Sequence, residues 1–181
     1  MSNGFDDILI VKKEIYSDKR GYFFESFNEK DFFSQTKLDI KFVQDNISFS
    51  NKFAIRGLHA QVGDFKQNKL ITVLSGKIFD VVVDLRRNSK NFGRYAHFQI
   101  DEKSNFSLFV PPWYAHGFQA LTDKTIIHYK VDCHYKKSHE LAIRINDKDL
   151  NIKWPNLHKG IISEKDSQGI TFKDFKRNIT F

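Results

Sequence analysis

The sequence is poor in the residues that build disulfide frameworks, flexible linkers and membrane spans. Its 181 residues include one cysteine, three prolines and nine glycines. The single cysteine, Cys133, excludes an internal disulfide and a cysteine-based metal cluster. No apolar run approaches the ~20 residues that span a bilayer, and residues 1–7 lack the basic and apolar regions of a secretion signal. We therefore expect a cytoplasmic protein without a membrane partner.

The charge is unbalanced toward the basic side. There are 29 Lys and Arg residues against 22 Asp and Glu residues, a formal net charge of +7. Such an excess attracts anions, including nucleic acids, phospholipid headgroups and nucleotides. The basic residues are scattered, however, and no basic stripe with interleaved aromatic residues indicates nucleic-acid binding. Most of the lysines are therefore interpreted as a solvated surface.

Hydrophobic residues make up 40% of the chain and aromatic residues 15%, enough for one domain over residues 1–181 with a real core. Short apolar runs separated by turn signals predict strands at 42–50, 54–61, 69–74, 78–85, 94–100, 106–110, 117–121 and 125–131. Ser75-Gly76-Lys77 predicts a hairpin between two of them, and 22–27 predicts a further strand. A short helix is expected within 28–38, and the tail from Ala142 is expected to be irregular, with a short terminal helix. The pattern favours an all-β sandwich, jelly roll or barrel.

One stretch, Arg56-Gly57-Leu58-His59, combines a fixed positive charge, a glycine and a histidine within a predicted strand. In a regular strand Gly57 and His59 face one side and Arg56 and Leu58 the other. A strand histidine is more often structural than catalytic, and a lysine at a strand end, such as Lys69, is often solvated. If both point into one cavity, the histidine is suited to proton transfer and the lysine to stabilising an oxyanion.

Three more residues have both an ordinary and a chemical interpretation. His116 is either packed near a turn or part of a site. Tyr129 is either core filler or an acid, and Asp166 is by default a solvated loop charge. A metal site would need a His-x-His pair, but His59-Ala60-Gln61 offers one histidine, so we expect no metal. No phosphate-binding or dinucleotide-binding glycine pattern is present, so we expect no redox cofactor.

Several motifs occur together in one order along the chain. They are Phe42-Val43-Gln44-Asp45-Asn46, Arg56-Gly57-Leu58-His59, the run from Phe79 to Arg86, Pro111-Pro112 with Ala115-His116-Gly117-Phe118, and Asn146-Asp147 through Trp154-Pro155. From about residue 8 to residue 170, this order resembles the dTDP-4-dehydrorhamnose 3,5-epimerase family. The resemblance implies a metal-free, cupin-type jelly roll with short helices near the termini, and a homodimer. It also implies cofactor-independent epimerisation at C3 and C5 of a dTDP-4-keto-6-deoxy sugar.

The resemblance also implies roles for individual residues. His59 is similar to the general base, Asp166 to the carboxylate that orients it, Tyr129 to the opposite acid and Lys69 to the contact of the C4 oxygen. Substrate contacts are implied for Arg20, Glu25, Gln44, Asn46, Arg56, His116, Tyr135, Glu140 and Lys165. Some of the nucleotide contacts are expected to reach across the dimer, and Tyr135 to stack on the base.

The chain departs from the family pattern at several positions. Ala60 follows the histidine where an aromatic residue is usual, Trp113 replaces a glycine, and Thr72 stands where an arginine is frequent. Residues 62–68 replace a proline-containing loop. These departures spare the acid and base but leave the identity of the sugar open. Two alternatives remain: an enzyme that inverts only C3 or isomerises the ketone of a related sugar nucleotide, and a non-catalytic cupin that binds a sugar nucleotide, against which the presence of the acid and base residues argues.

Overall fold

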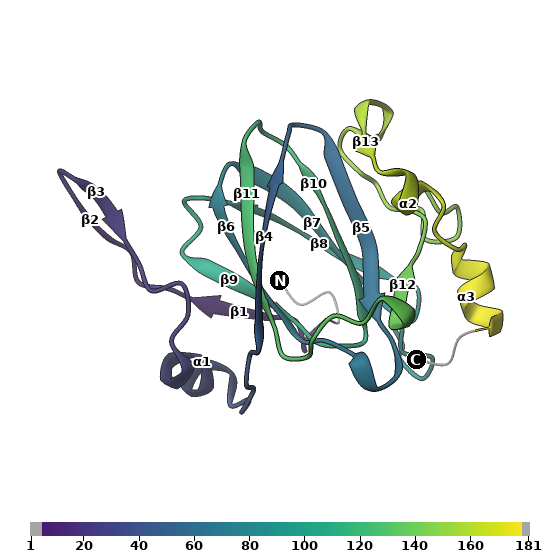
Figure 1. The fold of residues 1–181 in the computed structure, drawn as a ribbon, viewed down its shortest axis with the longest axis horizontal. Coiled ribbons are helices and arrows are strands. Elements are labelled where there is room, and N and C mark those ends of the chain that lie inside the picture. The colour runs from purple at the N-terminus through teal and green to yellow at the C-terminus, as the bar shows by residue number, and fades with distance from the viewer. Residues whose placement is uncertain (1–4, 179–181) are drawn as a thin grey trace.

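Two facing β-sheets form the body of the protein (Figure 1). The structure, a computed structural model, describes residues 5–178. In spatial order, the first sheet consists of β1 (Leu9–Lys12), β9 (Phe106–Val110), β6 (Lys69–Ser75), β11 (Thr125–Val131) and β4 (Gln44–Ser50). The second consists of β12 (Glu140–Ala142), β5 (Ala54–Gln61), β10 (Tyr114–Ala120), β7 (Lys77–Asp84) and β8 (Tyr95–Asp101), with β13 (Ile161–Ile162) beside β5. The expected all-β jelly roll is confirmed.

Among the described residues, helices are few and short. They are α1 (Glu29–Thr36), α2 (Glu164–Ser167) and α3 (Phe172–Asn178), and 3-10 turns occupy Gly63–Phe65, Lys137–His139 and Leu157–Lys159. The helix α1 begins where the Asn28 side chain accepts hydrogen bonds from the backbone N–H groups of Lys30 and Asp31. This cap satisfies donors that the start of a helix leaves unpaired. Within residues 5–178, no helix is long and apolar enough to cross a membrane.

The turn at Ser75-Gly76-Lys77 connects the two sheets and does not close a hairpin. The strand β6 pairs with β9 and β11, whereas β7 pairs with β8 and β10. Gly76 has a φ of +77°, and a Cβ there would lie 2.5 Å from Thr122 Oγ1, so the position requires glycine. The hairpin prediction was wrong, because a tight glycine turn serves equally well where the chain crosses from one sheet to the other.

Apolar side chains from both sheets fill the space between them. This inner core includes Ile71, Val73, Ile78, Val82, Ile100, Leu108, Val110, Phe118 and Ile127. Alternate residues of β7, namely Phe79, Val81 and Val83, belong instead to a second core on the outer side of its sheet. Because β7 is buried on both faces, its sequence is a nearly continuous apolar run.

The C-terminal third of the chain covers the outer face of the second sheet. Leu141, Ile143, Trp154, Phe172 and Phe175 are buried there with β5 and β7. Figure 1 shows α2, α3 and β13 on this side of the molecule, next to β5 and β12. The segment expected to be irregular therefore packs as a layer, and this packing places α2 against β5.

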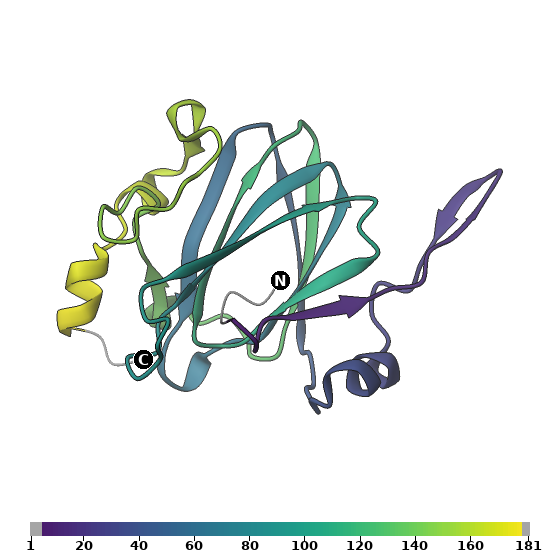
Figure 2. The ribbon, with the colours of Figure 1, turned by 180° about the vertical axis from the view of Figure 1, so that it is seen from behind.

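The hairpin formed by β2 (Tyr16–Asp18) and β3 (Gly21–Phe23) stands away from the body, as both views show (Figures 1 and 2). Within residues 5–178 these strands pair only with each other. The Tyr16, Tyr22 and Phe23 side chains are exposed. The strand predicted over 22–27 was too long, since its pairing ends at Phe23.

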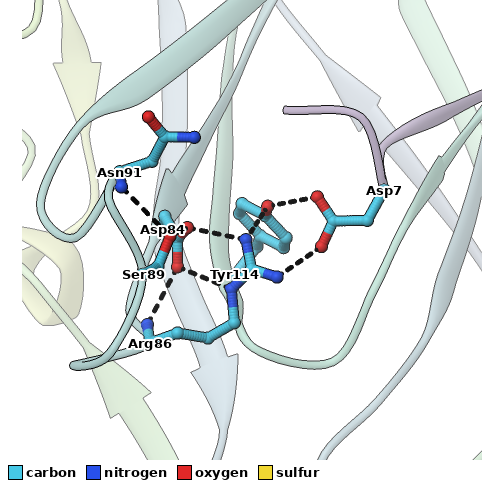
Figure 3. A network of polar contacts seen from close by, with 6 residues as sticks. All are labelled: Asp7, Asp84, Arg86, Ser89, Asn91 and Tyr114. Carbon is cyan, nitrogen blue, oxygen red and sulfur yellow. Dashed lines mark hydrogen bonds and ion pairs between the residues drawn. The ribbon is translucent and has the colours of Figure 1, made fainter. Parts of the chain in front are cut away.

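A polar network links the start of the chain to the end of β7 (Figure 3). The Arg86 guanidinium donates two hydrogen bonds to Asp84, one of them at 2.7 Å, and one to Asp7 at 2.7 Å. The Tyr114 hydroxyl donates to Asp7 at 2.7 Å, and burial together with that hydrogen bond raises the pKa of Tyr114. The carboxylate of Asp84 is fully buried, and the two-pronged contact from Arg86 offsets the cost of desolvating it.

Candidate active site

A cavity of about 330 Å³ lies between the sheets and collects most of the residues singled out in the sequence. The catalytic candidates among its lining residues are His59, Lys69, Tyr129 and Asp166, and the binding candidates are Arg56, His116, Tyr135, Glu140 and Lys165. They come from β5, β6, β10, β11, β12, α2 and the segment after β11. Residues far apart in the sequence therefore share one site.

Strand periodicity directs two of these side chains inward. On β6, Lys69 lies two residues before Ile71 and four residues before Val73. On β11, Tyr129 lies two residues after Ile127. Ile71, Val73 and Ile127 belong to the core between the sheets. Because alternate residues of a strand share a face, Lys69 and Tyr129 face the same interior. Lys69 is 9% exposed, so the solvated interpretation of this lysine was wrong.

The strand β5 carries an irregularity that brings Arg56 and His59 to the same side. His59 is opposite His116, but Arg56 is opposite Phe118, so three residues of β5 span two of β10. The extra residue of such a bulge shifts the alternation by one. Gly57 lies in this bulge, and a Cβ on it would lie 2.5 Å from Gly117 Cα. The expectation that Arg56 faces away from His59 was therefore wrong, since it assumed a regular strand.

His59 forms a pair with Asp166. Its Nε2 lies 2.7 Å from Asp166 Oδ1. An ionised carboxylate only accepts hydrogen bonds, so the shared proton is on Nε2 of His59. The other ring nitrogen, Nδ1, can then accept a proton from a substrate. Burial opposes ionisation of Asp166, but the hydrogen bond and charge of His59, with a hydrogen bond from the Gly57 N–H, hold the pKa of Asp166 below its usual value. Asp166 is 4% exposed, which rules out a solvated loop charge.

Lys69 is a buried amine. Its Nζ donates to the His59 backbone oxygen at 3.2 Å. Burial lowers the pKa of Lys69 to about 8, while the charges of Asp80 and Glu140 act in the opposite direction. Lys69 is therefore mostly a cation at neutral pH, and it has two further N–H donors available inside the cavity.

Tyr129 lies on β11, opposite Ile71 of β6 and Asn46 of β4. Burial raises the pKa of its hydroxyl, and the charge of Arg56 opposes this increase only in part. The hydroxyl is therefore protonated near neutral pH. A protonated phenol in a cavity that also holds an imidazole can deliver a proton.

His116 has a carboxylate partner that was not among the site residues predicted from the sequence. Its Nε2 lies 2.7 Å from Oδ2 of Asp80, a fully buried residue of β7. The sequence contains a signal for it, because Asp80 alternates with Ile78 and Val82 on an otherwise apolar strand face. The site therefore contains two histidine–aspartate pairs, with the histidines directly opposite each other on β5 and β10.

Glu140 connects the residues at the rim of the cavity. It accepts from Lys165 Nζ at 2.6 Å and from the Tyr135 hydroxyl at 2.8 Å. Burial acts to raise the pKa of Glu140, but these hydrogen bonds and the Lys165 charge leave it lowered. The bond to Glu140 raises the pKa of Lys165. A cation and an aromatic ring are thus held side by side.

The remaining binding candidates lie outside the cavity lining. Gln44 donates to Asn46 at 2.8 Å and accepts from the Tyr135 backbone N–H at 3.2 Å, so this pair adjoins the rim. Arg20 lies in the projecting hairpin and pairs with Asp18 at 2.6 Å, and Glu25 follows that hairpin. Within the described residues, the structure does not bring Arg20 or Glu25 to the cavity.

Comparisons with known proteins agree with this geometry. A family model described as dTDP-4-dehydrorhamnose 3,5-epimerase matches residues 3–174. The chain belongs to this epimerase family. The family's enzyme from Shigella flexneri is 39% identical over 168 residues, covering 93% of this chain and 92% of the relative.

Solved structures of family members superpose closely on this chain. The dTDP-4-dehydrorhamnose 3,5-epimerase from Elizabethkingia anophelis is 40% identical, with a TM-score of 0.87 and 96% of each chain covered. The dTDP-6-deoxy-D-glucose-3,5-epimerase from Legionella pneumophila, solved in complex with dTDP-4-keto-L-rhamnose, is 34% identical. Its TM-score is 0.90, and the match covers 96% of this chain and 92% of that one.

The positions at which the chain departs from the epimerase family pattern lie at different distances from the cavity: some line it and others do not. Ala60 borders the cavity, as does Gln67 in the altered loop. Thr72 is buried and bonded to Ser107 at 2.6 Å, and Trp113 lies partly exposed at the turn before β10. Among residues 5–178 no group of three or more His, Cys, Asp or Glu side chains is arranged to hold a metal ion. Lining residues such as Ser48 and Ser163 had no signal in the sequence.

Proposed function

We propose that the protein is an epimerase that converts dTDP-4-dehydro-6-deoxy-glucose to dTDP-4-dehydro-rhamnose by inverting C3 and C5. One observation carries the proposal: His59, Lys69 and Tyr129, which come from three different strands, line one cavity. The Legionella pneumophila relative was solved in complex with dTDP-4-keto-L-rhamnose, which supports the choice of substrate.

The first step is removal of a proton from a carbon next to the C4 ketone. In our proposal Nδ1 of His59 takes this proton, and the electron pair of the C–H bond moves into an enolate with its negative charge on O4. Asp166 holds the ring and balances the imidazolium that forms, as paired carboxylates do in other acid/base sites. The Lys69 ammonium, beside the enolate oxygen, stabilises the charge where it develops.

Inversion requires a proton on the opposite face of the same carbon. The Tyr129 hydroxyl, kept protonated by its buried surroundings, supplies it, and the enolate electron pair forms the new C–H bond. Exchange with solvent then returns the proton to the phenolate and removes one from His59. Because C3 and C5 both adjoin the same ketone, one set of groups acts on both centres.

The residues that line the cavity and its rim fit an anionic nucleotide sugar. In the proposed complex Arg56, His116 and Lys165 contact the substrate and its diphosphate, and Tyr135 stacks on the base. Glu140, Gln44 and Asn46 complete the binding surface. The positive groups near the cavity agree with the overall charge of +7.

We infer that the active form is a homodimer. The projecting hairpin exposes Tyr16, Tyr22 and Phe23, and the edge strand β4 exposes Ile47 at 71% and Phe49 at 54%. Exposed apolar groups on a projecting hairpin and an open strand edge are typical of association surfaces. In such a dimer Arg20 and Glu25 of one subunit reach the substrate bound to the other, which accounts for their distance from the cavity within one chain.

The function is tested by incubating the protein in deuterated water with a panel of 4-keto-6-deoxy sugar nucleotides, and then using mass spectrometry and a coupled downstream reductase. The proposal predicts two deuterons per molecule of the dTDP sugar. A single deuteron would indicate inversion at one centre only. If the protein binds members of the panel but none of them gains deuterium, the protein is not an epimerase and is a binding protein instead.

A further inference from the structure

An aspartate on β7 interrupts an apolar face of the sandwich. Ile78 and Val82 belong to the core between the sheets, and strand alternation places Asp80 between them on the same inner face. Asp80 is fully buried. An ionised carboxylate in such a place costs folding free energy unless its partners offset the lost hydration. None of the roles proposed above uses this residue.

The two oxygens of Asp80 differ in their surroundings. Oδ2 accepts the hydrogen bond from His116 Nε2 at 2.7 Å. Oδ1 is buried and has no hydrogen-bond partner within the described residues. A buried polar atom without a partner is uncommon and costs stability. Packing alone therefore does not account for an aspartate at this position.

Lys69 is the second group that Asp80 affects. Burial lowers the pKa of this amine to about 8, and of the two carboxylates that oppose the decrease, Asp80 has the larger effect and Glu140 the smaller. Glu140 already accepts hydrogen bonds from Lys165 and Tyr135. Asp80 is thus the carboxylate whose charge acts on the buried ammonium and whose Oδ1 can still accept a hydrogen bond.

Other ionisable groups face the cavity from each neighbouring element. They are Arg56 and His59 on β5, His116 on β10, Tyr129 on β11, Tyr135 in the segment after β11, Glu140 on β12, and Lys165 and Asp166 on α2. Asp166 is committed to His59. Because burial disfavours the ammonium form of Lys69, a carboxylate that opposes this effect is needed for Lys69 to stay protonated.

We propose that Asp80 is a positioning residue for the reaction: its carboxylate orients the His116 ring and is the counter-ion that keeps Lys69 charged in the cavity. The proposal rests on the proposed epimerase function, in which the Lys69 ammonium stabilises the enolate at O4. A neutral lysine cannot do so as well. Asp80 therefore sets the upper end of the pH range in which the enzyme works.

Asp80→Asn tests this, because asparagine keeps the size and one acceptor oxygen but removes the charge. The lysine titration is followed by NMR in substrate-free protein labelled with ¹³C-lysine, with the Lys69 signal identified by its loss in Lys69→Met. In the wild type Lys69 should titrate near pH 8. In Asp80→Asn its midpoint should move to lower pH by about 1 pH unit, and the alkaline limb of kcat should move with it.

Asp84→Asn is the matched control, since Asp84 is a second fully buried carboxylate on β7. Its partners belong to the network of Figure 3 and lie outside the cavity lining. This variant should lower the melting temperature and leave the Lys69 titration and the kcat limb unchanged. A purely structural role for Asp80 predicts the same pattern for both variants.

The outcomes separate the two proposals. An unchanged Lys69 midpoint in Asp80→Asn would overturn the counter-ion role in an enzyme that still epimerises. Failure of the wild type to exchange deuterium would instead overturn the proposed function. If Asp80→Asn does not fold, the wild type labelled with ¹³C-aspartate decides the matter. The Asp80 carboxyl signal should then shift as Lys69 titrates near pH 8, and a flat signal would refute the coupling.

Discussion

At the scale of single residues, ordinary side chains gain chemical properties from burial and from their partners. Lys69 and Tyr129 both lie in the interior, but burial affects them in opposite ways: it lowers the pKa of the lysine and raises that of the tyrosine. The result is an amine close to its titration point in the same cavity as a phenol that keeps its proton. His59 has its proton-bearing nitrogen fixed by Asp166. Each group is thus prepared for its proposed role before substrate binds.

Lys69→Met should raise the stability of the fold and lower the activity. The pKa of Lys69 is about 8 in the folded protein, below the ~10.4 of an unfolded chain. The folded state therefore carries the cost of the charge below pH 8, and this cost is relieved as pH rises through the window from 8 to ~10.4. The variant should gain up to about 3 kcal/mol of unfolding free energy at pH 7 and lose at least about 100-fold in kcat.

Urea unfolding and a steady-state assay measure the two effects. Lys103→Met, which replaces an exposed lysine in a turn, is the control and should change neither quantity. A Lys69→Met enzyme with normal kcat would exclude Lys69 from the stabilisation of the enolate.

Tyr129→Phe should separate proton loss from inversion. The variant keeps the ring and its packing but removes the hydroxyl that delivers the second proton. Net inversion should fall by at least about 100-fold, while His59 still exchanges the substrate proton with solvent. Time-resolved NMR in deuterated water follows deuterium incorporation and product formation separately. Equal rates of inversion in variant and wild type would remove Tyr129 from the mechanism.

At the scale of elements, a strand could be predicted where its sequence pattern lies within the strand itself, and its pairing partners could not. The runs over 54–61, 106–110 and 125–131 coincide with β5, β9 and β11, because apolar alternation is a property of the segment itself. Which sheet a strand joins is not local, so the turn at Gly76 was misread as a hairpin. The bulge at Gly57 depends on the register with β10, so the common orientation of Arg56 and His59 could not be derived from alternation alone.

Gly57→Ala should lower the unfolding free energy more than the same substitution at Gly21, another glycine with a positive φ. Gly57 has a φ of +124° and its added Cβ would lie 2.5 Å from Gly117 Cα, whereas Gly21 has a φ of +132° and nothing within 4 Å. We expect Gly21→Ala to cost about 1 kcal/mol and Gly57→Ala at least about 2 kcal/mol more, because of the clash with backbone. Urea unfolding compares them, and equal losses would contradict the close approach of the two strands.

At the scale of the whole molecule, the family resemblance identified most of the residues that the fold brings together. His59, Lys69, Tyr129 and Asp166 are spread along the chain but line one cavity. The physical patterns alone left their roles open, because a buried histidine or tyrosine has no signature in periodicity. The partnership of His116 with Asp80 depends on the pairing of β7 and β10 and became visible only in three dimensions.

The dimer proposal predicts that the projecting hairpin is needed for assembly and for catalysis. Replacing Tyr22 and Phe23, which are 59% and 64% exposed, by serine should convert the dimer to a monomer and reduce activity. Ile161→Ser is the matched control, since Ile161 is 59% exposed on β13, away from the hairpin in Figure 1. Light scattering after size exclusion gives the mass. A wild type that is already monomeric and fully active would refute this part of the proposal.

The most direct test of the central claim is deuterium uptake from solvent by the sugar in the presence of His59→Ala. With the wild type, the dTDP-4-keto sugar should gain deuterium at C3 and C5. With His59→Ala, uptake at both carbons should fall to the rate without enzyme, while circular dichroism and dTDP binding remain normal. Uptake by this variant at the wild-type rate would contradict the assignment of His59 as the base on which the mechanism depends.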